Sequence, residues 1–443
     1  MNGLSVCRLS LAVLLAGAGC ALEGDERGAD LDDDVGRSQY AVLSSLQPGY
    51  STTSNVHALA NRCAEDPIGD IASGLITDPN YIMAYRSGKH SDYESCEGTI
   101  ACSGGGGGGG SVAAHYYREW QESDDYHRQS IQRIHRNSTN YLLVSHSVEP
   151  YTETCWYPGF DVVEIGGAGH STGFGNLGSG GVTPTSPALC GDHIVKYQEY
   201  SSPVRRHGGG MQVNGDYAVV AFEDPNHAVD ASFRTFDLSD PPNSFSGPTV
   251  FRQSGTDKTQ GSSAALTRIN DGRFMVMVFG DDAADVEVFV SAGTTMPAPT
   301  APTDWDSKGS FDFFGSDLHD FANVQFVTEC DDGDANTSGR LFVVATYRDN
   351  SDQDWVHLYR VKFNALPTYA PTFEYVKSRE MTCSSANTGG TRYCDFDAGA
   401  GVFVDGNGRL ILYGVEHWND HHDVSPLSPY YDHAVKVREF STH

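Results

Sequence analysis

A pair of short strands joined by a turn recurs along the 443-residue chain, and this recurrence most limits the folds open to it. The second strand of each pair is a near-continuous apolar run, as expected for a strand buried on both faces. The first strand of each pair is rich in small residues. The six pairs occupy residues 72–76 and 81–87, 129–134 and 141–147, 208–213 and 217–224, 264–269 and 274–282, 322–327 and 341–349, and 400–404 and 410–418. The recurrence predicts an all-β fold assembled from repeated units.

Two further strands extend most of these units. An alternating strand follows the hairpin at 160–166, 231–239, 286–293, 355–363 and 434–440, and an edge-like strand precedes the next hairpin at 114–120, 192–200, 248–253, 310–314 and 372–377. Four antiparallel strands repeated at a long, uneven period are typical of a β-propeller. The glycines at 208–210 then fit an innermost strand, where backbones crowd the axis and side chains must be small.

The number of blades depends on the first pair. The last unit stops after its third strand, so we expect a strand near the N-terminus to complete it, close the ring and remove exposed edges. If 72–87 forms a blade of its own, there are six blades and the closing strand lies in 39–62. If it does not, there are five and 114–120 closes the ring. We favour six, because 72–87 fits the repeat.

The N-terminus predicts export. Arg8 is followed by the apolar run LSLAVLLAGAG, which is too short to span a membrane, so residues 1–19 are interpreted as a signal peptide. The small residues before Cys20 resemble a bacterial lipoprotein signal, which implies lipidation of Cys20 and a cell-surface or outer-membrane location; plain secretion is the alternative. Residues 20–37 form an acidic tether, and 38–443 form a single propeller domain.

Charge and cysteines agree with export. The formal charge of −29 argues against nucleic acid as a partner, since phosphate binding requires an excess of Lys and Arg. Eight cysteines remain after Cys7 and Cys20 are set aside, and an even number in an oxidising compartment suggests disulfides. The local candidates are Cys96 with Cys102 and Cys383 with Cys394.

One unit resembles a known family. The segments GDYAVVAFED and FRTFDLSDPPNS, within Val213 to Ser244, are similar to the repeats of bacterial secreted propellers of the LVIVD type. The resemblance covers about one blade. It implies a propeller fold and a surface location, and it implies no activity.

Propeller topology sorts the chemically capable side chains by face. Inner strands start, and their partners end, on one face, whereas the tight turns lie on the other. The side chains expected on the first face, as a ligand or metal surface, are Asp70, His127, His207, Asp320, Asp397, Glu223, Asp224, Glu416 and His417. Such carboxylates and imidazoles could hold Ca²⁺ or another divalent metal, or they could simply be solvated.

A second metal candidate is the long turn DDGDANTSG. Asp332, Asp334 and Asn336 are spaced like the start of a calcium loop, but Thr337 and Val343 stand where an EF-hand needs Gly and Glu. A hairpin turn that can hold Ca²⁺ is the resulting hypothesis.

These observations favour an exported, lipid-anchored propeller that binds an extracellular polysaccharide, peptide or protein. One alternative is a metal-dependent or carboxylate-based hydrolase, in which Asp70, Asp320 and Asp397 would act as acid, base or modulator. The other is an envelope scaffold that has no small-molecule site. The sequence assigns no catalytic residue.

Overall fold

The computed structural model places much of the second half of the chain and parts of the first. The described residues are 63–75, 81–86, 97–102, 110–115, 128–136, 139–147, 158–165, 192–200, 204–205, 207–268, 272–280, 285–313, 321–330, 340–349, 351, 353–363, 369–382, 394, 396, 399–405, 407–415 and 434–441. The chain divides into Met1–Ser38 and Gln39–His443, and all of these residues belong to the second part. The expected signal peptide, Cys20 and the whole acidic tether therefore lie outside them.

The described part of the chain is mainly β-structure, and twenty of its strands form five antiparallel groups of four. The first two groups are β4 (Arg128–Arg136), β5 (Thr139–His146), β6 (Gly159–Ile165), β7 (Asp192–Glu199), and β8 (His207–Asn214), β9 (Tyr217–Glu223), β10 (Ser232–Asp237), β11 (Phe245–Phe251). The next two are β12 (Ser263–Arg268), β13 (Phe274–Phe279), β14 (Asp285–Ser291), β15 (Trp305–Asp312), and β16 (Asn323–Thr328), β17 (Leu341–Arg348), β18 (Asp354–Phe363), β19 (Pro371–Met381). The fifth is β20 (Gly399–Val404), β21 (Leu410–Val415), β22 (Ala434–Phe440) and β1 (Tyr81–Arg86).

Four short helical elements and one hairpin stand outside these groups. They are α3 (Pro67–Gly69) with the π-helical turn η3 (Asp70–Gly74), the single 3₁₀ turns η5 (Pro241–Asn243) and η7 (Pro302–Asp304), and the pair β2 (Glu97–Cys102) and β3 (Gly110–His115). None of the helices in the described residues is long and apolar enough to cross a bilayer.

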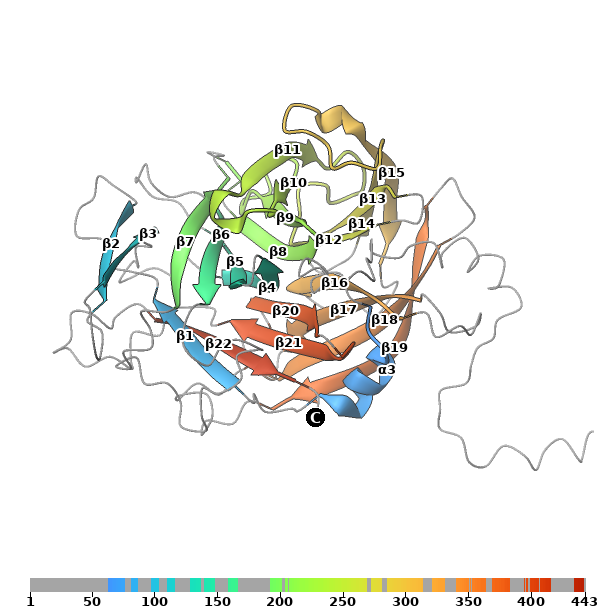
Figure 1. Ribbon diagram of the computed structural model, residues 1–443. Helices are drawn as coiled ribbons and strands as arrows, with labels where there is room; N and C mark the ends of the chain where they lie inside the picture. The colour runs from blue at the N-terminus through green and yellow to red at the C-terminus, as the bar shows by residue number, and fades with distance from the viewer. Residues whose placement is uncertain are drawn as a thin grey trace, which may run out of the picture. The chain divides into compact units, whose positions relative to one another are not determined.

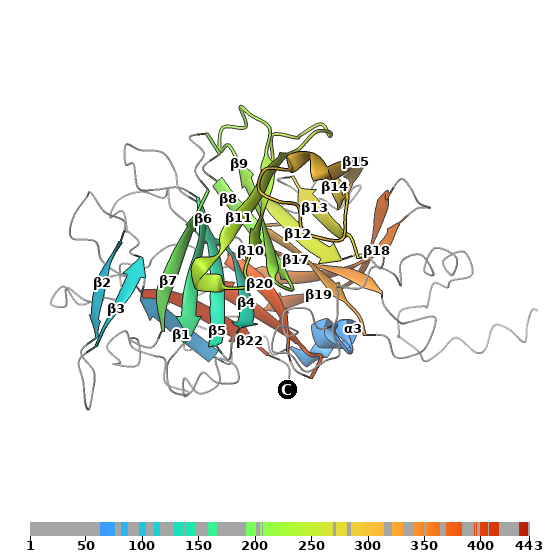
Figure 2. The ribbon, with the colours of Figure 1, turned by 45° about the horizontal axis from the view of Figure 1, so that its top comes forward.

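The first strand of each group, here called the inner strand, lies beside a common central axis. The inner strands β4, β8, β12, β16 and β20 neighbour one another in chain order, and β20 returns to β4 (Figures 1 and 2). Neighbouring inner strands are parallel where they pair, at Ser263 with Gly210 and at Ala400 with Ser130. All five therefore begin on one face, here called the start face, and end on the other, the turn face. This arrangement confirms the predicted all-β propeller fold.

The glycines of the inner strands are required by this close approach. A Cβ on Gly209 would lie 2.2 Å from the carbonyl oxygen of Ser262, and one on Gly401 would lie 1.6 Å from that of Ile131. Both clashes involve backbone atoms, of the residue directly before β12 and of β4, so no rotamer change could relieve them. The expectation that small residues mark the innermost strands is confirmed.

The apolar runs fill the spaces between neighbouring groups. One cluster joins Met275 and Val288 of the third group to Val343 and Tyr359 of the fourth. A second joins Phe342 of the fourth group to Leu412 of the fifth, and two further clusters join the first group to the second and the second to the third. Burial of apolar surface thus holds each group to the next, from the first group to the fifth.

The N-terminal segment does not form the hairpin that the sequence predicts. Residues 67–74, where an inner strand was expected from 72, are helical: Pro67 occupies the first helical position and the Asp66 side chain caps the turn by accepting from the Gly69 N–H at 2.8 Å. Residues 81–86 form β1, which pairs with β22, the C-terminal strand (Figure 1). The missing strand is therefore supplied by β1, and both predicted closing strands, in 39–62 and at 114–120, are wrong in this respect.

A disulfide fixes the same segment. Cys63 is bonded to Cys330, 267 residues away, and Ala64 forms a parallel bridge with Glu329 beside it. Sequence spacing did not indicate this pairing. Cys394 is also disulfide-bonded. The proposed Cys96–Cys102 and Cys383–Cys394 pairings stay predictions, because Cys96 and Cys383 lie outside the described residues.

Candidate functional site

Only four of the side chains predicted for the start face are described. His127, Asp320, Asp397, Glu416 and His417 lie outside the described residues, as do Asp332, Asp334 and Asn336 of the candidate calcium loop. The structure places Asp70, His207, Glu223 and Asp224, and it brings only two of them into direct contact.

His207 and Glu223 form a close pair on the start face. His207 is the first residue of β8 and stands opposite Glu223, the last residue of β9. The imidazole Nδ1 lies 2.6 Å from Glu223 Oε1, and Nε2 lies 2.9 Å from the side-chain nitrogen of Gln129 on β4. An amide nitrogen can only donate, so Nε2 accepts from Gln129 and the Nδ1–H is donated to Glu223.

The carboxylate of this pair is enclosed, whereas the imidazole reaches solvent. Glu223 is 3% exposed and its Oε2 accepts from the Gly261 N–H, while the His207 side chain is 20% exposed. Burial by itself raises the pKa of Glu223. The hydrogen bond from His207, its charge when protonated, the Gly261 N–H and the nearby His227 outweigh burial, so the pKa lies below its ordinary value. A buried carboxylate thus orients a partly exposed imidazole.

Asp224 stabilises a turn next to this pair. Its Oδ1 accepts from the Asn226 N–H at 3.1 Å and its Oδ2 from the Ala228 N–H at 3.0 Å. The turn also holds His227 at a φ of 51°. Asp224 therefore fixes backbone conformation, as aspartates in turns commonly do.

Asp70 lies away from the start face, contrary to the prediction. It begins η3, and its carboxylate accepts from Arg409 Nε at 2.8 Å and from the Leu410 N–H at 2.8 Å. Leu410 begins β21 directly after the turn from β20, so Asp70 belongs to the turn face. Burial raises the pKa of Asp70 despite the hydrogen bonds and charge of these partners. The helix at 67–74 is what removes Asp70 from the axis.

Glutamine side chains bridge the inner strands halfway along the axis. Gln212 Oε1 accepts from the Leu266 and Phe326 N–H groups, both at 2.9 Å, and its Nε2 donates to the Phe326 carbonyl at 2.7 Å. Gln325 joins Val402 to Met211, and Gln132 accepts from Val213. These amides replace ladder hydrogen bonds that the diverging inner strands do not make. The sequence reasoning missed them, although Gln recurs within three of the inner strands.

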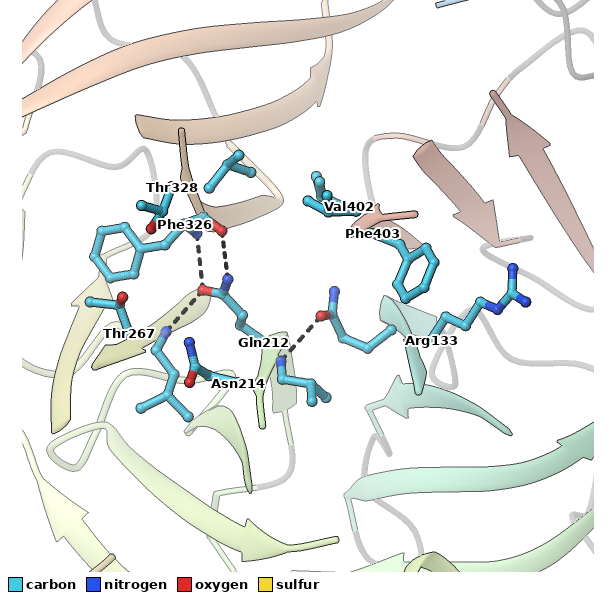
Figure 3. Close-up of a pocket in the computed structure, with 13 residues that line it drawn as sticks. Arg133, Gln212, Asn214, Thr267, Phe326, Thr328, Val402 and Phe403 are labelled. Carbon is cyan, nitrogen blue, oxygen red and sulfur yellow. Dashed lines mark hydrogen bonds between the residues drawn. The ribbon is translucent and has the colours of Figure 1, made fainter. Parts of the chain in front are cut away.

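A pocket opens on the turn face beyond these glutamines (Figure 3). It is an open recess with room for little more than water, and all five inner strands contribute to its wall. The lining residues are Gln132, Arg133, Gln212, Val213, Asn214, Leu266, Thr267, Phe326, Val327, Thr328, Val402, Phe403 and Val404. We call it the turn-face pocket. It contains none of the residues predicted for the ligand surface.

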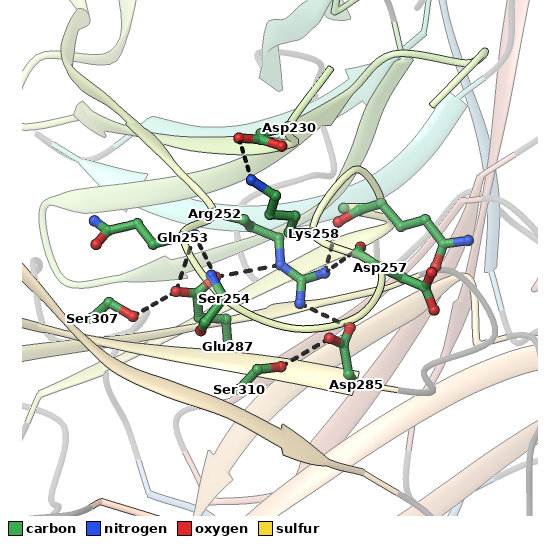
Figure 4. Close-up of polar contacts among 12 residues, drawn as sticks. Asp230, Arg252, Gln253, Ser254, Asp257, Lys258, Asp285, Glu287, Ser307 and Ser310 are labelled. Atoms are coloured by element: carbon green, nitrogen blue, oxygen red, sulfur yellow. Dashed lines mark hydrogen bonds and ion pairs between the residues drawn. The ribbon is translucent and has the colours of Figure 1, made fainter. Parts of the chain in front are cut away.

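A buried charge cluster supports the loop that enters β12. Arg252, 1% exposed, contacts Asp285 Oδ1 at 2.8 Å and Glu287 Oε2 at 3.6 Å, both on β14 (Figure 4). Glu287 also accepts from the Gln253 N–H at 2.9 Å, and Asp285 accepts from the Ser310 hydroxyl at 2.8 Å. The carboxylates are thus engaged by one cation and several donors, which suits a structural role.

The described residues hold no group of three or more His, Cys, Asp or Glu side chains placed to bind one metal ion. The metal hypotheses rest on residues outside this part of the chain, and they stay hypotheses.

Comparison with known proteins gives distant structural likeness only. No family model matches the sequence, and no curated protein is significantly similar to it. Among solved structures, a GH32 beta-fructofuranosidase of Bombyx mori matches with a TM-score of 0.40 and 12% identity over 71% of this chain and 59% of that chain. An alpha-L-arabinofuranosidase from Lactobacillus brevis matches with a TM-score of 0.36 and 10% identity over 59% of this chain and 81% of that one.

A GH43_1 enzyme from Xanthomonas citri gives a TM-score of 0.34 and 10% identity over 71% of this chain and 87% of that chain. The chain thus spans less than two thirds of the silkworm enzyme that it matches. Likeness at this level does not assign an activity.

Proposed function

We propose that the protein is an exported five-bladed β-propeller that binds an extracellular ligand through its start face, with His207 as a contact residue. Five strand groups, the last of which is completed by β1, support a blade number of five rather than six. Export and lipidation at Cys20 are proposed from the N-terminal sequence, and LVIVD-like character from Val213 to Ser244.

One observation carries the binding proposal. The His207 imidazole is partly exposed, while the groups that orient it, Glu223 and Gln129, are at most 7% exposed. A side chain held in this way has lost its rotamer freedom before a ligand arrives, which lowers the entropic cost of binding. A ligand hydroxyl or amide N–H could take the place of Gln129 at Nε2. Polysaccharides and peptides both carry such donors.

The test is a binding screen with the purified chain on arrays of immobilised polysaccharides and of unstructured peptides. His207→Ala should weaken binding about tenfold or more, since a hydrogen bond and the shape of the site are lost. The matched control is His135→Ala, which removes a half-buried histidine at the opposite end of β4. The proposal would be contradicted if His207→Ala bound as tightly as the unmodified chain, or if His135→Ala also lost binding.

Hydrolysis is the second candidate, and it is favoured by the same pair. An imidazole oriented by a carboxylate is an arrangement suited to a general base. A hydrolase would release reducing ends or peptide termini from the bound polymers. It should lose that release in the His207 variant more completely than it loses binding. Binding without release would leave the binding role alone.

A further inference from the structure

Two Asn-Gly pairs lie at hairpin turns of the turn face, and the structure presents their asparagines differently. Asn214 is the last residue of β8, pairs with Tyr217 and is 7% exposed. Asn407 lies between β20 and β21, outside both strands, and is exposed. The third Asn-Gly pair of the sequence, at Asn2, is outside the described residues. The two described pairs therefore share a dipeptide and differ only in their surroundings.

An asparagine followed by glycine is open to attack on its side chain by the next backbone nitrogen, because glycine has no Cβ to shield that nitrogen. At this turn the Gly408 nitrogen would form a bond to Cγ of Asn407, and the Cγ–Nδ2 bond would break. The Gly408 N–H proton passes through solvent to the departing nitrogen, so ammonia leaves and a succinimide ring remains. Water then opens the ring to aspartate or to isoaspartate, in which the backbone runs through Cγ and is one carbon longer.

The turn at Asn407 gives this attack few obstacles. The Gly408 N–H donates to the Asp405 carbonyl at 3.2 Å, which is at the long end of the range for such bonds. The ladder between β20 and β21 ends at Val404 with Leu410, so the backbone of Asn407 can rotate without breaking a strand pair. The same rotation at Asn214 would disturb the last pair of β8 with β9. Solvent, which carries the base and the water, also reaches Asn407 more readily.

Gly408 holds the N-terminal part of the described chain. Its carbonyl accepts from the Glu65 N–H at 2.7 Å, and a Cβ on Gly408 would lie 2.4 Å from Glu65 Cγ, so the two residues are in direct contact. An extra backbone carbon before Gly408 would shift it relative to Glu65. The new carboxylate would also add a negative charge next to Asp405, whose own carboxylate accepts from the Asn407 N–H at 2.8 Å. Both changes act against the contact with Glu65.

We propose that Asn407 is a site of spontaneous deamidation and that its isoaspartate form loosens residues 63–75 from the turn face. The fold protects Asn214 and leaves Asn407 reactive. The Cys63–Cys330 disulfide keeps the segment attached after the modification, so the expected change is local. This modification site lies on the turn face and does not depend on the function proposed for the start face.

The first test is incubation of the purified full chain in warm, mildly alkaline buffer, followed by peptide mass spectrometry and enzymatic methylation of isoaspartate. Asn407 should convert about tenfold faster than Asn214 or more, because a strand residue must first open locally. The matched control is the same chain in urea, where the two asparagines should convert at similar rates. Equal rates in the folded chain, or an unconverted Asn407 under conditions that convert it in urea, would overturn the assignment.

Hydrogen exchange tests the consequence. In the aged chain, amides of residues 63–75 should exchange about tenfold faster than in the fresh chain, whereas those of β12 should keep their rate. Asn407→Ser removes the reacting amide, so this variant should show the same exchange before and after ageing. Unchanged exchange of residues 63–75 in a sample that is mostly isoaspartate would overturn the link between Asn407 and the N-terminal segment.

Discussion

Tyr81 lies opposite Glu439 in an antiparallel pair, although the two residues come from opposite ends of the sequence. Through this pairing β1 completes the group that begins with β20. The inner strand of that group adjoins β4, so the pairing joins the last strands of the chain to its first part. Because β22 pairs with β21 on one side and with β1 on the other, neither of its edges is left exposed.

We predict that proline in β1 weakens this closure. N–H groups of a strand alternate in direction, so one of the variants Met83→Pro and Ala84→Pro should remove a hydrogen bond to β22 and the other should not. The more damaging variant should lower the free energy of unfolding by about 1–3 kcal/mol in urea titrations. Ala84→Ser keeps the N–H and serves as control. Two harmless proline variants would argue against the pairing.

The Cys63–Cys330 disulfide should stabilise the protein through the long loop that it closes. Cys63→Ser/Cys330→Ser should lower the free energy of unfolding by about 2–5 kcal/mol, because the unfolded chain regains loop entropy. The measurement is chemical denaturation without reductant. A stability equal to that of the unmodified chain would show that the helical segment and β1 hold the N-terminal part without the covalent bond.

Arg252 and Lys258 offer a direct comparison of a buried and an exposed ion pair (Figure 4). Arg252→Met should cost about 3–5 kcal/mol, since it leaves two buried carboxylates, Asp285 and Glu287, without their cation. Lys258→Met breaks a pair with Asp230 whose side chains are 43% and 38% exposed, and it should cost less than about 1 kcal/mol. Similar losses in the two variants would contradict the structural role of the cluster.

The His207–Glu223 pair should make stability depend on acid pH. The pKa of Glu223 lies below its ordinary value of 4.5 in the folded protein. Its contribution is therefore fully present above about pH 4.5 and is lost as the pH falls through the folded-state pKa. In urea titrations from neutral to acid pH, Glu223→Gln should flatten this decline. The control, Glu374→Gln, removes a carboxylate from a surface pair with Lys362 and should keep the decline unchanged.

Truncation of Gln212 on the axis should destabilise the protein. Gln212→Ala leaves the Leu266 and Phe326 N–H groups without their acceptor, and each should cost about 1–3 kcal/mol unless water enters from the turn-face pocket. Gln253→Ala, at an exposed side chain whose backbone alone is engaged, should be neutral. Thermal melts of the two variants distinguish these outcomes. Equal melting temperatures would contradict a structural role for Gln212 at the axis.

The sequence determined the repeated unit. The five hairpins that begin at 129, 208, 264, 322 and 400 form as predicted, and so do the third strands at 160–166, 231–239, 286–293, 355–363 and 434–440. Their signals are local: a turn, an apolar run and glycines where backbones meet. The start-face position of His207 and Glu223 followed from the same pattern.

Tertiary structure decided how the units join. The apolar run at 81–86 fits either a second strand or an outer one, and only pairing with β22 distinguishes them. The helix at 67–74 is capped by Asp66. It is also held by the hydrogen bond from Arg409 to Asp70, two residues that are 339 positions apart in the sequence. The Cys63–Cys330 bond and the bridges made by Gln212 and Gln325 are likewise long-range. Such partners are chosen by the three-dimensional arrangement of strands, because local sequence carries the propensity of a segment but not the identity of what it meets.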